Sequence, residues 1–167
     1  MKKLIVILFV FFISFYCFSQ KISGITTTLI IIEEQENDTF VNDSTPFTDG
    51  IFNAMWEKEF IFFDMKIDKP IKVVSGMLEI QSYVNDARGA GADSILLIKF
   101  NYKTKKEGAG IRLSATEALY NLYSLNTMKS LRNGKIKLNI SEYIENNDKK
   151  NAFLKNTGND ILNDIYK

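Results

Sequence analysis

The chain has 167 residues, a formal net charge of +1, one cysteine and no histidine. This composition excludes Ser-His-Asp and Cys-His nucleophilic sites, and also zinc, haem and iron–sulfur sites built from histidine and cysteine. The near-neutral charge gives no electrostatic reason to expect a nucleic acid or an anionic membrane surface as a partner.

The first 19 residues have the pattern of a signal peptide. Lys2 and Lys3 precede the uncharged apolar stretch LIVILFVFFISFYCF, and Cys17 and Ser19 are small residues at the two positions that signal peptidase reads. We expect cleavage after Ser19.

The N-terminal segment has two alternative interpretations. An uncleaved anchor would need roughly 20 apolar residues, and this run has about 15. A lipoprotein acylated on Cys17 would need a small residue before it, where the chain has Tyr16. After cleavage, residues 20–167 would form one domain, with 19 basic and 20 acidic residues and no cysteine.

The first half of this domain is predicted to alternate strands and helices. TTTLIIIEEQ, residues 26–35, is rich in β-branched residues and predicts a strand covered on both faces. Thr45 or Thr48 is a plausible cap for the next helix, and FIFFDMKI, residues 60–67, predicts a second buried strand. Apolar residues of that helix recur at helical spacing: Ile51, Phe52, Met55 and Trp56. We expect Trp56 and the Phe60–Phe63 run to be core, with a carbohydrate or partner platform as the alternative.

A helix from Ser75 to Gly89 is predicted next, because Met77, Ile80, Val84 and Ala87 recur at spacings of three and four. The strand SILLIKFNY, residues 94–102, follows it. The glycines of NDARGAGADSILLIKF resemble a phosphate-binding loop, but such a loop follows a strand and opens a helix. Here the order is reversed, so we expect a helix stop and a tight turn.

Residues beyond 110 have two interpretations. Antiparallel strands at residues 112–125 and 129–140 fit the alternation in NGKIKLNI, whereas a capping box at Ser114–Glu117 would begin a helix. We prefer the strands. A terminal helix carries Leu154, Gly158, Ile161 and Ile165 on one face, with Gly158 allowing close approach to the sheet. The chain therefore predicts an α/β layered domain: a mixed sheet of about five strands ordered β-α-β-α-β, an antiparallel hairpin and a C-terminal helix.

This order of elements, with ARGAGADSILLI between helix and strand and the hairpin YSLNTMKSLRNGKI, resembles small exported α/β domains of bacterial envelopes. The amino-terminal domain of the translocation protein TolB and the curli-secretion lipoprotein class are similar in plan. The hairpin turn of those families often reads Thr-Gly-Lys, whereas this chain has Thr127-Met128-Lys129. The resemblance implies an envelope role through protein contacts, without catalysis.

The candidate site lies where the first three strands end, because parallel strands bring their carboxyl ends to one edge of the sheet. Residues 36–47, 66–74 and 103–110 would meet there as loops. In and around the first loop we expect exposed carboxylates with ordinary pKa values. We expect these carboxylates to face the lysines of the third loop. The candidate partner-binding residues are Asp38, Asp43, Asp49, Lys103, Lys105 and Lys106. Ordinary solvated loops, a calcium site and a carboxylate-pair active site are the alternatives.

From these observations we expect a non-catalytic exported protein of the periplasm or cell surface that binds another envelope protein. It should need no cofactor or metal, bind no nucleic acid and keep no membrane span after processing. The alternative is a hydrolase of the periplasm or cell surface that works through carboxylates. A deep pocket with two close carboxylates, one with a raised pKa, would favour this alternative.

Export provides the first testable prediction. We expect the intact mass of the exported protein to match a chain that begins at Gln20, because cleavage after Ser19 removes the charged and apolar segments together. A retained N-terminus or an acyl group on Cys17 would contradict the prediction.

Overall fold

The computed structural model describes residues 27–41, 44–67 and 69–167, so the signal peptide predicted for residues 1–19 lies outside the described residues. A mixed six-stranded sheet runs through the described part of the chain. Its order is β2-β1-β6-β7-β8, and β3 lies beside β1 on the same side as β2. The strands are β1 (Thr27–Glu36), β2 (Thr39–Phe40), β3 (Ile61–Asp64), β6 (Ser94–Glu107), β7 (Gly110–Ser124) and β8 (Lys129–Ile144).

The directions of these strands agree with the predicted α/β layered fold. β1 pairs in parallel with both β3 and β6, whereas β6, β7 and β8 form antiparallel pairs. The two long hairpin strands are therefore confirmed, and the alternative helix beginning at Ser114 is wrong. Within the described ranges, no helix is long and apolar enough to cross a membrane.

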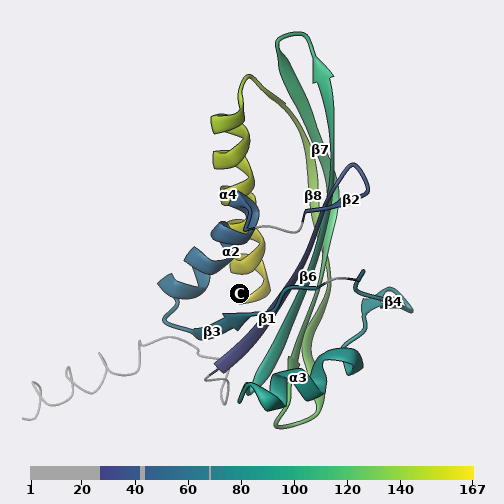
Figure 1. Ribbon diagram of the computed structural model, residues 1–167, viewed down its shortest axis with the longest axis vertical. Helices are drawn as coiled ribbons and strands as arrows, with labels where there is room; N and C mark the ends of the chain where they lie inside the picture. The colour runs from purple at the N-terminus through teal and green to yellow at the C-terminus, as the bar shows by residue number, and fades with distance from the viewer. Residues whose placement is uncertain (1–26, 42–43, 68) are drawn as a thin grey trace, which may run out of the picture.

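The two faces of the sheet are covered differently (Figure 1). On the first, which we call the helix face, lie α2 (Pro46–Glu57) and α4 (Asn147–Ile165). On the second, the hairpin face, lie three small elements that cover only its lower part in the view of Figure 1. These elements are the hairpin of β4 (Val73–Val74) and β5 (Met77–Leu78), the 3₁₀ turn η1 (Gln81–Tyr83) and the helix α3 (Val84–Gly89).

The central strand β1 is buried on both faces, as its continuous apolar run predicts. Ile30 packs into the core under α2 and α4, and Ile31 packs into the second core under α3 and the β4–β5 hairpin. Because side chains alternate along a strand, even-numbered β1 residues point to the helix face and odd-numbered ones to the hairpin face.

Two glycines set the distance between α2 and α4. A Cβ atom at Gly158 would lie 2.2 Å from the carbonyl oxygen of Phe47, and one at Gly50 would lie 2.0 Å from that of Lys155. Since real Cβ atoms do not come so close, the backbones of the two helices meet only because both positions are glycine. The predicted close approach of Gly158 is thus to α2, and not to the sheet.

The helix predicted from Ser75 is wrong over its first half. Ser75 and Gly76 have φ angles of 52° and 79° and form the turn of the β4–β5 hairpin. Leu78 and Ile80 are buried in the second core from this extended chain, so tertiary packing outweighs their helical spacing. The predicted glycine turn is present, since α3 ends at Gly89 and Gly91 adopts a φ of 74° before β6 begins.

Trp56 is also placed differently from the prediction. Its side chain is 78% exposed, whereas Ile51 and Met55 on the same helix are fully buried. One residue corresponds to about 100° of rotation on a helix of 3.6 residues per turn. Trp56 therefore lies beyond the buried stripe of α2.

The glycine contact can be tested by substitution. We expect Gly158→Ala to lower the free energy of unfolding by about 1–3 kcal/mol, because the new methyl group meets a backbone carbonyl that cannot rotate away. Gly89→Ala is the matched control, since nothing lies within 4 Å of a Cβ there. Urea denaturation of both variants checks this, and equal stability of the two would contradict the close helix contact.

Candidate functional site

The connections that leave β1 and β3 run to opposite faces of the sheet (Figure 1). The segment after β1 leads to α2 on the helix face, and the segment after β3 leads to the β4–β5 hairpin on the other face. Adjacent parallel strands with this arrangement form a topological switch point, where open α/β sheets usually bind ligands.

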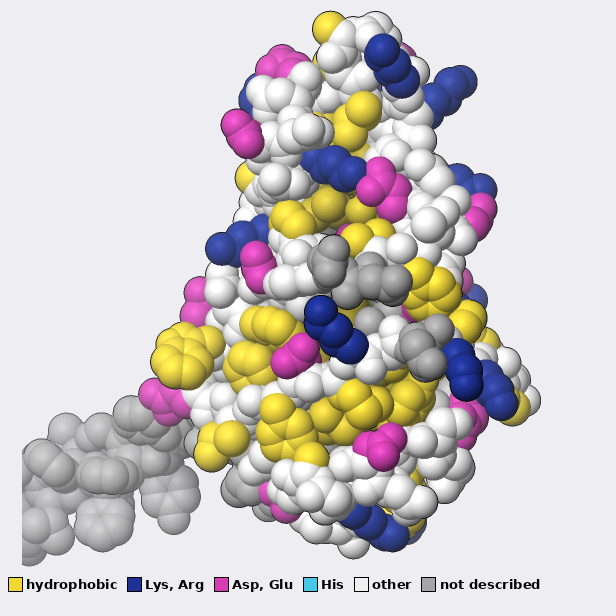
Figure 2. Space-filling view, in the orientation of Figure 1, with side chains coloured by type: hydrophobic (Ala, Val, Ile, Leu, Met, Phe, Trp, Pro, Cys, Tyr) yellow, Lys and Arg dark blue, Asp and Glu magenta, His cyan; other side chains and the backbone are white. Residues whose placement is uncertain are grey.

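A groove lies at this switch point. The register of β3 with β1 ends at Ile30, and that of β2 begins at Gln35, so residues 31–34 lie between the two strands. A cavity of about 90 Å³ opens beside this part of β1. Its walls are formed by both polar and apolar side chains, and apolar side chains also gather on the surrounding surface in the lower half of Figure 2. The apolar lining includes Ile30, Ile32, Phe40, Phe52, Met65 and Ile67.

Glu34 is the buried ionisable residue of the groove, with only 3% of its surface exposed. Its Oε2 accepts a hydrogen bond from the hydroxyl of Thr45, the residue that caps α2. Its Oε1 is buried and has no hydrogen-bond partner. Burial raises the pKa of Glu34 above its usual value, and the hydroxyl groups of Thr45 and Tyr102 offset only part of this effect.

Thr45 connects the groove to the helix. Its Oγ1 accepts a hydrogen bond from the backbone N–H of Thr48 (3.1 Å), as expected for an N-cap, while its own proton goes to Glu34. The positive end of the α2 dipole therefore lies beside the Glu34 carboxyl group, where it favours negative charge.

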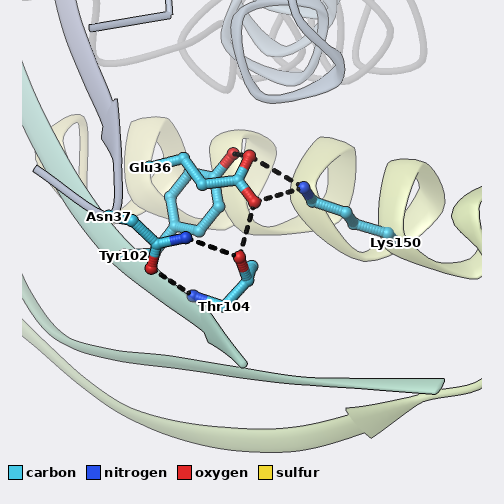
Figure 3. A network of polar contacts seen from close by, with 5 residues as sticks. All are labelled: Glu36, Asn37, Tyr102, Thr104 and Lys150. Carbon is cyan, nitrogen blue, oxygen red and sulfur yellow. Dashed lines mark hydrogen bonds and ion pairs between the residues drawn. The ribbon is translucent and has the colours of Figure 1, made fainter. Parts of the chain in front are cut away.

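Glu36 belongs to a polar network next to the groove (Figure 3). Lys150 of α4 binds both of its carboxylate oxygens, at 2.7 and 2.8 Å, and Thr104 donates to Oε1 at 2.7 Å. The Tyr102 hydroxyl donates to Oε2 at 3.2 Å. Burial alone would raise the pKa of Glu36, but these donors outweigh it and the pKa is lowered. Burial and the two neighbouring carboxylates raise the pKa of Tyr102.

Glu33 points to the opposite face and is fully buried there. Its carboxylate pairs with Lys99 (2.7 Å), accepts from the Gln35 amide (2.8 Å) and accepts from the backbone N–H of Ile71 (2.5 Å). This carboxylate thus holds the segment that leads into the β4–β5 hairpin, and all of its partners come from the protein.

The predicted acidic candidates lie apart from one another. Asp38 is exposed in the β1–β2 turn with a φ of 63°, and Asp49 is exposed in the first turn of α2. Asp43 lies outside the described residues. The expectation of exposed carboxylates in and around the first loop is wrong for Glu33 and Glu34, which are buried.

The predicted lysine loop is part of a strand. Lys103, Lys105 and Lys106 belong to β6 and pair with β7 through a register that reaches Glu107 and Gly110. By strand alternation, Lys103 and Lys105 point to the hairpin face, whereas α2 and Asp49 lie over the helix face. The predicted opposition is therefore wrong for Lys103 and Lys105, whereas alternation places Lys106 on the helix face. The Asp38 turn does adjoin β6, because Asn37 exchanges hydrogen bonds of 2.9 Å with Thr104.

Residues 36–47 and 66–74 do contribute to the groove, through Phe40, Val41 and Ser44 and through Lys66 and Ile67. Glu34 and Thr45, its key polar residues, were missed. A signal for them exists in the sequence, because glutamates at the end of a strand buried on both faces must each find a partner or a ligand.

The groove is too small for a nucleotide or a sugar. Pockets for such ligands usually measure about 300–1,000 Å³, against about 90 Å³ here. In the part of the chain that the structure describes, no group of three or more histidine, cysteine, aspartate or glutamate side chains is placed to hold a metal ion.

No protein-family model and no curated protein matches the sequence. Among solved structures, the chain is similar to lipoprotein GNA1162 from Neisseria meningitidis, with 17% identity and a TM-score of 0.43 over 83% of this chain and 97% of that one. It is similar to TolB from Acinetobacter baumannii, with 14% identity and a TM-score of 0.38 over 86% of this chain and 29% of TolB.

The C-terminal domain of LpoB from Salmonella enterica is also similar, with 14% identity and a TM-score of 0.40 over 76% of this chain and 92% of that domain. At these identities and TM-scores the likeness assigns no function to this chain. The proposals below rest on its own residues.

Glu33 and Glu34 are neighbours with different partners, so substitution of each one tests the described contacts of the site. We expect Glu33→Gln to lower the free energy of unfolding at pH 7 by about 1–3 kcal/mol, because Lys99 loses its buried counter-charge. Urea denaturation at pH 7 measures this cost.

Glu34→Gln should behave differently. The folded-state pKa of Glu34 is raised above its usual 4.5, so its neutral form is favoured in the folded protein. The wild type should therefore lose stability relative to Glu34→Gln as the pH rises above the usual glutamate pKa of 4.5. Denaturation of both proteins at pH 4 and pH 7 checks this, and a difference that does not depend on pH would contradict the raised pKa.

Proposed function

We propose that the chain is a non-catalytic binding module of the bacterial cell envelope that works by contact with another protein. The observation that carries this proposal is an uncovered, positively charged sheet surface. The export signal predicted for residues 1–19 supports the location in the periplasm or at the cell surface.

This surface, which we call the open face, is the part of the hairpin face beyond the β4–β5 hairpin and α3. Side chains of β6, β7 and β8 that point to this side are exposed there, and no helix lies over them in Figure 1. Strand register places the following residues on it: Lys103, Lys105, Arg112, Ser114, Glu117, Lys135, Lys137, Ser141 and Tyr143.

The charge of the open face favours an acidic partner. Two of its cations are neutralised, Arg112 by Glu107 and Lys135 by Glu117. Lys103, Lys105 and Lys137 form no ion pair with any described residue, which leaves about three positive charges on the open face. The same face carries the ring of Tyr143, which is 46% exposed. An aromatic ring among basic side chains suits a protein surface that carries carboxylates.

One observation favours the hydrolase alternative, namely the raised pKa of Glu34 inside a groove. Two others weigh against it. The groove holds about 90 Å³, too little for a sugar ring and an attacking water. The neighbouring carboxylate of Glu36 is neutralised by Lys150 and does not line the groove. Binding is therefore the function that the geometry supports best.

The open face can be tested with a matched pair of triple variants. We expect Lys103→Ala, Lys105→Ala and Lys137→Ala together to weaken partner binding about tenfold at low salt, since each charge contributes modestly. The control replaces Lys69, Lys72 and Lys155 with alanine, because these lysines are also exposed and lie elsewhere.

The measurement is capture of envelope proteins by the immobilised domain, followed by titration of the captured protein against each variant. Binding should also weaken with added salt in the wild type and less so in the open-face variant. If both triple variants bind the captured protein equally well, the open face is not the binding surface.

A further inference from the structure

We propose that the groove between β2 and β3 binds a primary ammonium group on a short alkyl chain, with the carboxylate of Glu34 as the partner of the ammonium. This site is separate from the open face, which lies on the other side of the sheet, beyond the β4–β5 hairpin and α3. The inference therefore does not depend on the proposed function.

The first argument is the unpaired oxygen of Glu34. Of its two carboxylate oxygens, Oε2 is held by Thr45, and no hydrogen bond of ordinary geometry reaches the buried Oε1. The Tyr102 hydroxyl lies close enough to lower the pKa of Glu34, but its hydrogen bond at 3.2 Å goes to Glu36. More than nine in ten buried polar groups in proteins have a hydrogen-bond partner. A ligand in the groove could supply the hydrogen-bond donor that Oε1 of Glu34 lacks.

The second argument is that no lysine of the described residues forms an ion pair with Glu34. Lys150 binds Glu36 and Lys99 binds Glu33, each at 2.7 Å. Lys66 lines the groove but is exposed and forms no ion pair among the described residues. Glu34 is therefore a carboxyl group that is fixed in position and that forms no ion pair with Lys66, Lys99 or Lys150.

The third argument is the charge of the groove. Glu34 and Asp64 line it together with the single cation Lys66. Asp49 adds a further carboxylate at the edge, where it accepts a hydrogen bond from Ser44 at 3.3 Å. A bound cation would favour the ionised form of Glu34, and with Glu34 ionised the groove has an excess of negative charge that favours a cationic ligand over an anionic or neutral one.

The fourth argument is size and lining. A cavity of about 150 Å³ in a protein core accepts benzene, so the 90 Å³ here suits a single unbranched chain. Phe40, Phe52 and Met65 would contact its methylene groups while the nitrogen reaches Glu34. A free alkylamine and the side chain of a lysine share this chemistry.

The test uses n-butylammonium as the probe and follows the amide signals of the folded protein by NMR. We expect n-butylammonium to bind at least tenfold more tightly than 1-butanol, which has the same chain without the charge. It should also bind more tightly than tetramethylammonium, which has the charge without an N–H donor. Glu34→Gln should abolish the preference for n-butylammonium, because the amide keeps the shape and loses the charge.

Three further variants keep the result interpretable. Ser44→Tyr should block the groove from its exposed rim, and it serves if Glu34→Gln fails to fold. Lys66→Met should bind n-butylammonium at least as well as the wild type, because it removes a competing cation. The triple alanine variant of the open face should bind n-butylammonium unchanged, which separates this site from the proposed function.

The source of the ammonium group is tested with capped Gly-Lys-Gly and Gly-norleucine-Gly peptides. Preference for the lysine peptide identifies a lysine side chain as the ligand, whereas binding of n-butylammonium alone identifies a free amine, and either outcome supports the site. Equal binding of n-butylammonium and 1-butanol, or a preference that survives in Glu34→Gln, overturns the proposal.

Discussion

The register in which β1 pairs with β6 determines where the charged groups in the middle of the protein lie. Glu33 falls opposite Lys99 on one face, and Glu36 falls opposite Tyr102 on the other. A shift by one residue would exchange the two faces and remove each carboxylate from its donors. Because a buried carboxylate without donors is strongly unfavourable, this pairing stabilises one register against its neighbours.

The helix layer depends on this register and shapes the groove. Gly50 and Gly158 let α2 lie against α4, and α4 in turn supplies Lys150 to the polar network around Glu36. The N-cap of α2, Thr45, then lies over β1 and binds Glu34. A single carboxyl group is thereby oriented, partly desolvated and left with one free oxygen. These are the properties of a group that is positioned to accept a ligand.

Several features follow from the sequence alone. The apolar run of β1, the alternation in β8 and the glycines before β6 predict the strand order and the mixed sheet, since they reflect local backbone preference and the period of burial. The absence of histidine likewise excludes whole classes of active site. These properties need no knowledge of which segments lie side by side, so a sequence contains them directly.

The tertiary structure decided the rest. Met77 and Ile80 have helical spacing, yet the segment around Ser75 forms a hairpin because burial of Leu78 against the sheet outweighs helical propensity. The sequence also does not distinguish Glu33 from Glu34, which follow each other in β1. Only the neighbouring strand and helix give the first a full set of donors and leave the second with a free oxygen in a groove. Pairing between distant residues determines both outcomes, and such pairing has no local signature in the chain.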